Sequence, residues 1–258
     1  MKPTGYAPLL ALATLAACSS YSSGITPPPD PSHVTFTALG DSAAVAAKLD
    51  EFRAALPGAL NAPNAPPAVS GRREINWDGA PPALTNIDAF PGRFFNETSK
   101  RGAVFITPGT GLRIDSTAFA SVNAAFPDQF SAFSQKKLFM PVGTNRVEVD
   151  FELVGTTTAG LVNGFGVVFS DVDRAGSTHV DFLDANGARI ARVDAPAHSG
   201  THEFSFVGVV FTSAVVARVQ IFSGDGPLIG NTADVSAGGP ADLVAMDDFV
   251  YGEPQPIP

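Results

Sequence analysis

From about residue 102 onward, apolar side chains recur mainly at every second position, and this period strongly constrains the possible fold. The clearest case is 147–153, where Val, Val, Phe and Leu alternate with Glu, Asp and Glu. Alternate residues of a β-strand point to opposite faces, so this segment predicts a strand with one buried and one solvated face. Residues 165–169 are apolar throughout, which predicts a strand covered on both faces.

Turn-forming residues separate the apolar segments. Asp184-Ala185-Asn186-Gly187 lies between 180–183 and 189–193, and Asn-Gly between two β-rich segments is a strong hairpin signal. Further strands are predicted at 104–106, 204–211, 215–222 and 243–251. Short strands with little helix between them predict a mainly β fold, an antiparallel β-sandwich or jelly roll preceded by a short N-terminal helix.

The N-terminal helix is predicted from a cap and an apolar face. Asp41 is a suitable N-cap, and Pro57-Gly58 ends the segment. Positions with helical spacing place on one face Val45, Leu49, Phe52 and Leu56. A second helical pattern of Phe residues at 116–133 is interrupted by Pro127, so we do not expect a long helix there.

Residues 1–17 have the features of an export signal. Lys2 precedes a short apolar segment at 6–17, which is too short to span a bilayer. It ends in Leu15-Ala16-Ala17-Cys18, which resembles the lipobox of bacterial lipoproteins. That resemblance implies that residues 1–17 are removed and that Cys18 is lipid-modified. The alternative is an ordinary secretory signal with a chance cysteine.

The next segment, 18–33, is rich in Ser and Pro and is predicted to be a flexible tether. Ser19 is not Asp, which by resemblance to lipoprotein sorting favours the outer membrane. The predicted organisation is therefore a signal peptide, this tether, a helical segment at 34–60, a β-sandwich at 61–253 and a Pro-rich tail at 254–258. We expect the protein in the cell envelope, bound to the membrane through its lipid.

Composition excludes several classes of function. The formal net charge is −9 and only 16% of residues are charged, so the basic surface that nucleic-acid binding requires is not expected. A single cysteine excludes a disulfide framework and a cysteine-based zinc site. A chain of 258 residues can bury enough apolar surface to fold without either.

Two short motifs invite a catalytic or metal-binding interpretation. Gly40-Asp41-Ser42 resembles the nucleophile motif of GDSL-type hydrolases, but the Asp-x-x-His pair that those enzymes carry near the C-terminus does not occur after this motif. We therefore prefer Asp41 as a helix cap. His198 and His202 have a metal-ligand spacing only if they lie on a helix, and the intervening Ser-Gly-Thr predicts a turn.

Four aspartates are the candidate metal ligands. Asp171 and Asp173 follow a buried strand, and Asp247 and Asp248 lie in the last predicted strand. Calcium takes six to eight oxygen ligands. Asp247-Asp248-Phe249 resembles the arrangement in secreted jelly rolls, which often hold a structural calcium where an early and a late strand meet. The alternative is that these carboxylates are solvated or cap backbone amides.

The candidate glycan-binding residues are Trp77 and Asp78. Carbohydrate-binding surfaces use Trp and Tyr rings, and Trp77 is the only tryptophan. The alternative is that Trp77 pins a loop onto the sandwich.

A hydrolase acting on an envelope or environmental polymer is the alternative function. Its carboxylates would be Glu148, Asp150 and Glu152, which share the polar face of one strand, roughly 6.6–7 Å apart at successive positions. A solvated strand face produces the same pattern.

Four segments resemble a family of secreted bacterial β-rich proteins: 72–79, 101–105, 164–169 and 246–249. The resemblance implies an exported β-rich domain and does not indicate any particular activity. The sequence thus predicts a lipid-anchored envelope protein with a non-catalytic binding or structural β-sandwich, whose partner is a glycan or an envelope protein.

Overall fold

The computed structural model describes Met1, residues 31–198, Gly200 and residues 202–258. The predicted signal peptide, Cys18 and nearly all of the predicted tether lie outside the described residues. Among the residues described, no helix is both long and apolar enough to cross a membrane.

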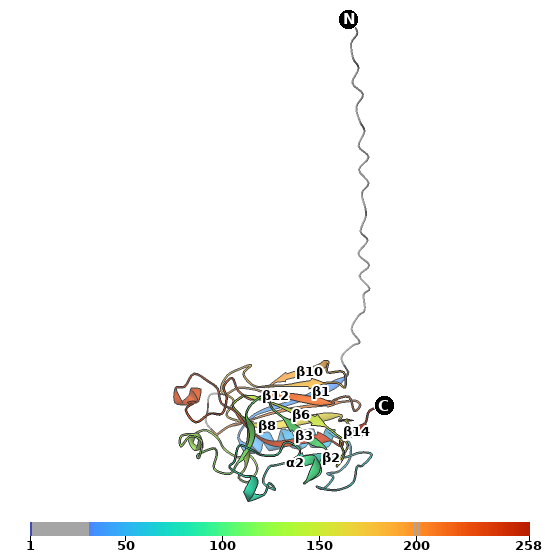
Figure 1. Cartoon of the computed structure of the whole chain (residues 1–258), viewed down its shortest axis with the longest axis horizontal. Coiled ribbons are helices and arrows are strands. Elements are labelled where there is room, and N and C mark those ends of the chain that lie inside the picture. Colours follow the sequence, from blue (N-terminus) through green and yellow to red (C-terminus); the bar gives the residue numbers. More distant parts are fainter. Residues whose placement is uncertain (2–30, 199, 201) are drawn as a thin grey trace.

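Two antiparallel sheets form the body of the molecule (Figure 1). The first sheet contains, in spatial order, β1 (His33–Gly40), β11 (Phe204–Phe211), β8 (Gly164–Ser170), β13 (Ala245–Gly252), β5 (Leu138–Val142) and β4 (Gly111–Asp115), with β2 (Arg72–Ile75) also paired to β13. The second sheet contains β10 (Arg189–Asp194), β9 (His179–Leu183), β12 (Arg218–Phe222), β6 (Arg146–Phe151) and β3 (Ala103–Ile106). A small third sheet pairs β14 (Gln255–Pro256) with β7 (Gly160–Leu161). The fold is a mainly β antiparallel sandwich, as predicted.

The main core lies between the two large sheets and follows from the period-two pattern. Alternate residues of β6 and β12 point inward and are fully buried, including Val147, Val149 and Ile221. The Asp184–Gly187 turn joins β9 to β10, so the predicted hairpin is confirmed. Strand β8 is buried along its whole length because its outer face is also covered.

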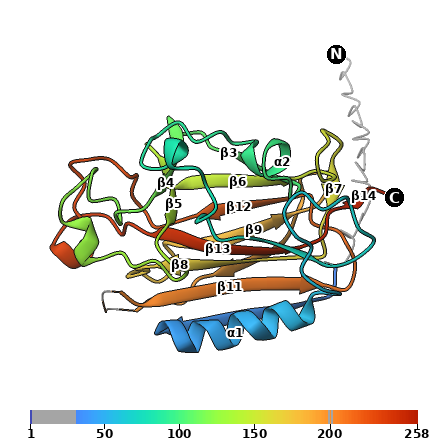
Figure 2. The same ribbon diagram turned by 90° about the horizontal axis from the view of Figure 1, so that it is seen from below.

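Helix α1 (Ser42–Ala55) supplies that cover (Figure 2). Asp41 caps it, because its side chain accepts a hydrogen bond from the Ala44 amide at 2.9 Å. Val45, Leu49 and Phe52 are fully buried against the outer face of the first sheet. The predicted cap and apolar face are therefore confirmed.

Two opposed glycines allow the helix to approach the sheet. Gly208 of β11 pairs with Gly166 of β8, directly beneath Phe52. A Cβ atom at Gly208 would lie 2.7 Å from the Phe52 ring, which is closer than real Cβ atoms approach. The absence of side chains at this pair makes the hollow that the Phe52 ring fills.

The segment at 116–133 forms a single short helical turn, η2 (Phe126–Asp128), and otherwise turns and loop. Its phenylalanines build a smaller core, here called the satellite core, with residues of β5, the 223–244 segment and β13. The buried members are Phe119, Phe126, Phe130, Leu138, Met140, Leu228, Leu243 and Ala245. The segment 223–244 carries the short helix η3 (Val235–Ala237), while the other short helices, η1 (Pro82–Leu84) and α2 (Phe94–Glu97), precede β3.

The sandwich has two distinct ends. At the proximal end, His33 pairs with Phe211, Asn163 lies beside both Thr212 and Glu253, and β14 pairs with β7. At the distal end, β8 finishes at Ser170, and the 116–133 and 223–244 segments form the satellite core. Residues 31–33 therefore lead into β1 at the proximal end, and two long connecting segments, 116–133 and 223–244, lie at the distal end.

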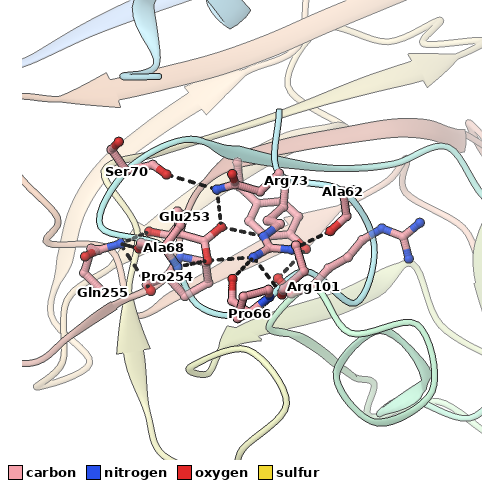
Figure 3. A network of polar contacts seen from close by, with 12 residues as sticks. Ala62, Pro66, Ala68, Ser70, Arg73, Arg101, Glu253, Pro254 and Gln255 are labelled. Atoms are coloured by element: carbon pink, nitrogen blue, oxygen red, sulfur yellow. Dashed lines mark hydrogen bonds and ion pairs between the residues drawn. The ribbon is translucent and has the colours of Figure 1, made fainter. Parts of the chain in front are cut away.

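A buried ion pair holds the residue 61–68 loop to the C-terminal segment at the proximal end (Figure 3). Arg73 donates to Glu253 at 2.5 and 2.8 Å, and both side chains are at most 1% exposed. The guanidinium also donates to the carbonyl of Ala62, and Glu253 accepts from the amide of Ala68 and the side chain of Asn61. Two remote segments are thus joined through one charged pair.

Candidate functional site

Trp77 belongs to the core, which corrects its assignment as a glycan-binding residue. Its side chain is 1% exposed, and its ring stacks on Phe139 with centroids 4.2 Å apart. Edge contacts from Phe95, Phe105 and Phe249 complete the cluster. A ring enclosed by four phenylalanines cannot receive a sugar face, so the alternative role, pinning the loop after β2, is the correct one.

Asp78 is likewise engaged in holding a loop. One carboxylate oxygen accepts from the Lys136 amide at 3.1 Å, and its backbone carbonyl accepts from the Lys137 ammonium. Asp78 therefore ties the residue 136–137 segment to the Trp77 turn.

The predicted metal ligands separate into two places. Ser170 of β8 lies opposite Ala245 of β13, so residues beyond Ser170 meet residues that precede Ala245. Asp173 consequently reaches Asp242, whose carboxylate accepts from the Asp173 amide at 3.3 Å. The antiparallel register thus brings Asp242, rather than the aspartates inside the last strand, to the end of β8.

Asp234 completes a cluster at the distal end. Carboxylate oxygens of Asp171, Asp173 and Asp234 all lie within 4.8 Å of one another. Asp234 also caps η3 by accepting from the Ser236 amide, and it accepts from the Leu243 amide at 2.7 Å. Asp242 accepts from the Arg174 amide and the Ser177 hydroxyl, so it shapes the loop that carries Asp173.

Asp171 is the unusual member of this cluster. Its side chain is fully buried, and within the described part of the chain neither carboxylate oxygen has a hydrogen-bond partner. Burial, with the charge of Asp173 and two other aspartates, raises the pKa of Asp171 to about 8. Burial and the charges of Asp234 and Asp242 raise the pKa of Asp173 to about 7.

Asp247 and Asp248 lie at a β-bulge of β13 and take no part in that cluster. Asp247 accepts from the Phe133 amide at 2.7 Å and from the amide and hydroxyl of Ser134. Asp248 lies 3.7 Å from the Arg53 guanidinium of α1. Their prediction as ligands of the same metal as Asp171 is wrong, because the bulge places them within the strand and not at its end.

The carboxylates of the hydrolase hypothesis lie on the outer side of the second sheet. Glu148 is bound by Arg146, and Arg218 binds both Glu148 and Asp150. Glu152 accepts from Arg93 at 2.6 Å. A guanidinium therefore contacts each of the three carboxylates.

A cavity of about 360 Å³ opens where this face meets the proximal end. Asp150 and Arg218 line it from the sheet, Asn186 from the β9–β10 turn, and Thr157 from the loop before β7. Thr157 and Asn186 are exposed, and Thr157 also borders a neighbouring cavity that contains Arg93 and Asn96. Sequence reasoning singled out Asp150 and Glu152, which both line this cavity, but it missed the other lining residues because they are dispersed along the chain and share no motif.

No protein-family model and no curated protein matches this sequence. Among solved structures, the chain is similar to the CBM22-1 xylan-binding domain from Paenibacillus barcinonensis Xyn10C, with 11% identity and a TM-score of 0.26 over 63% of this chain and 90% of that one. A second likeness, with 13% identity and a TM-score of 0.19, is to the enzymatically active domain of tailspike protein 4 from bacteriophage CBA120. It covers 55% of this chain and 21% of that one.

Proposed function

We propose that this chain is a cell-envelope lipoprotein, anchored through Cys18 in the outer membrane, whose β-sandwich binds a neutral glycan in the proximal cavity. The observation that carries the binding proposal is the set of polar groups around that cavity. Asp150, Arg218, Asn186 and Thr157 offer hydrogen-bond donors and acceptors from three separate segments. A volume of about 360 Å³ lies within the range of small-ligand sites.

The pairing of charges favours a neutral ligand. Arg218 is bound to Asp150 and Glu148, and Glu152 is bound to Arg93, which leaves Asp184 as the lining carboxylate without an ion pair among the described residues. A polyanion would be repelled by the excess of carboxylates in this lining. A hydroxyl-rich ligand can instead donate to the carboxylates and accept from the guanidinium and the amide.

The position of the cavity favours an envelope component as the source of the glycan. Thr157 and Ala159 line it directly before β7, which pairs with the C-terminal β14 at the proximal end. Residues 31–33 join β1 at the same end. A domain tethered through its N-terminus would therefore present the cavity toward the membrane surface.

The binding proposal is tested with the full chain purified in mild detergent, on an array of neutral and acidic glycans, followed by calorimetry with the best ligand. We expect binding to neutral glycans, weakened about 5–10-fold by Asn186→Ala, because one hydrogen bond contributes about 1 kcal/mol. Asn231→Ala is the matched control, since Asn231 is an exposed asparagine in the 223–244 segment. Binding to acidic glycans alone, or equal effects of the two variants, would contradict the proposal.

The anchor is tested separately in bacterial cells fed a fatty acid analogue that can be labelled. Wild-type protein is expected to incorporate the label and to fractionate with the outer membrane, whereas Cys18→Ser should incorporate none, because the thiol is the acceptor. Ser20→Ala, two residues away, should label normally. Equal labelling of wild type and Cys18→Ser would show that Cys18 is not the site.

A further inference from the structure

We propose that Asp171, Asp173 and Asp234 bind one calcium ion, which fastens the distal 223–244 segment to the end of β8. The three aspartates come from two segments that are more than 60 residues apart in the sequence, and their carboxylate oxygens lie within 4.8 Å of one another. Such a grouping could arise among exposed acidic residues without any ion. Two further observations point to a ligand.

The first observation is the state of Asp171. Its side chain is 0% exposed, both of its carboxylate oxygens lack a hydrogen-bond partner among the residues that the structure describes, and one of them faces Asp173 and Asp234. Buried polar groups in folded proteins are almost always bonded to protein or ordered solvent, and an orphaned carboxylate is the costliest exception. A bound cation would satisfy both oxygens at once.

The second observation is the balance of charge. Asp242 lies against the cluster and Asp225 lies nearby, so five carboxylates gather at this end of the sandwich. Arg174 is in the same loop, but its guanidinium is bonded to Asp225 and to the Pro240 carbonyl, 2.8 and 2.9 Å away. The Arg174 guanidinium is therefore engaged with other groups, and an added cation would supply the positive charge that lets the three proposed ligands ionise together.

The donor set favours calcium among the common cations. Carboxylate oxygens are hard ligands, and calcium accepts irregular sets of six to eight oxygens, whereas magnesium demands a near-octahedral set. Two orphaned oxygens on Asp171 and one on Asp173 are available outright. Asp234 accepts from the amide and hydroxyl of Ser236 on Oδ1 and from the Leu243 amide on Oδ2, which leaves one lone pair of Oδ2 for a metal. A solvent-facing cavity of about 240 Å³, lined by Asp173, Arg174, Val235 and Ser236, provides a path for the ion.

The role of the ion would be structural. Asp171 and Asp173 extend from β8, while Asp234 begins η3 in the middle of the 223–244 segment. That segment covers the satellite core through Leu228 and Leu243. Neutralising the carboxylates would hold the segment down on that core, and removing the ion would leave three close carboxylates to repel one another.

The experiment measures the thermal melt of the full chain in mild detergent with a chelator and then with excess calcium, alongside calorimetric titration of calcium chloride alone. We expect one calcium per chain and a midpoint higher by about 5–10 °C at a calcium concentration of about 100 times the dissociation constant. Magnesium is expected to give a smaller shift. No heat of binding and no midpoint shift, or an equal shift with magnesium, would overturn the proposal.

Two Asp-to-Asn variants separate a metal site from a merely structural cluster. In chelator, Asp171→Asn is expected to melt at or above the wild-type temperature, because it removes a buried carboxyl group whose ionised form is unfavourable there, and it should not respond to calcium. Asp173→Asn, at a less buried position, should also lose the response. Asp194→Asn, whose side chain is 61% exposed on β10, should keep the full calcium shift. A full shift in Asp171→Asn and Asp173→Asn would overturn the assignment.

Discussion

Glu253→Gln is expected to lower the free energy of unfolding by about 3–5 kcal/mol, because it leaves the Arg73 guanidinium buried without a counter-charge. Both side chains are at most 1% exposed, so water cannot replace the lost carboxylate. The variant would also weaken the contacts with Asn61 and the Ala68 amide, which hold the residue 61–68 loop. Urea titration followed by circular dichroism measures the change.

The control is an ion pair of the same type on the surface. Glu97 pairs with Arg93 four residues earlier on a short helix, and its side chain is 62% exposed. Glu97→Gln should change stability by less than about 1 kcal/mol, since exposed pairs contribute little. The double variant Arg73→Met with Glu253→Gln should recover part of the loss, because neither charge is then left alone. Equal effects of Glu253→Gln and Glu97→Gln would show that the buried pair contributes no more to stability than the exposed pair.

Trp77→Ala is expected to destabilise the fold by about 3–5 kcal/mol, the usual cost of deleting a buried aromatic side chain. The indole lies at the centre of a cluster with Phe95, Phe105, Phe139 and Phe249, which connects β2 and the chain before β3 to both large sheets. Its removal would leave a large cavity between the sheets. Because Trp77 is the only tryptophan, circular dichroism in urea should replace fluorescence as the measurement.

Trp77→Phe should cost less than Trp77→Ala, because a second ring fills most of the space. Folded Trp77→Ala protein should bind any glycan as wild type does, since the side chain is 1% exposed and cannot touch a ligand. A selective loss of glycan affinity with unchanged stability would restore the binding role that its burial argues against.

Local patterns in the sequence were sufficient for much of the fold. The alternation at 147–153 located β6, and the Asn-Gly turn located the β9–β10 hairpin. Asp41 and the spacing of Val45, Leu49 and Phe52 located helix α1 and its buried face. Each of these features depends on residues that lie a few positions apart, so it can be predicted from the sequence without knowledge of the tertiary structure.

The candidate sites depend on contacts between distant segments. The sequence marks Asp171 and Asp173 as candidate ligands because they directly follow a buried strand. Asp234, which lies in a loop some 60 residues later, carries no signal that connects it to them. The proximal cavity likewise draws on three segments that only the fold brings together.

The sequence by itself therefore determined the period of the strands, the position of the helix and the nature of the residues that can hold a cation. Only the tertiary structure decided which aspartates meet, because strand register pairs the end of β8 with the residues before β13 and sets Asp247 and Asp248 apart at a bulge. It also decided that Trp77 is buried, since the rings around it come from β3, β5, β13 and the segment before β3. The chemistry of a side chain follows from its residue type, whereas the segments that lie side by side are determined by how the whole chain packs.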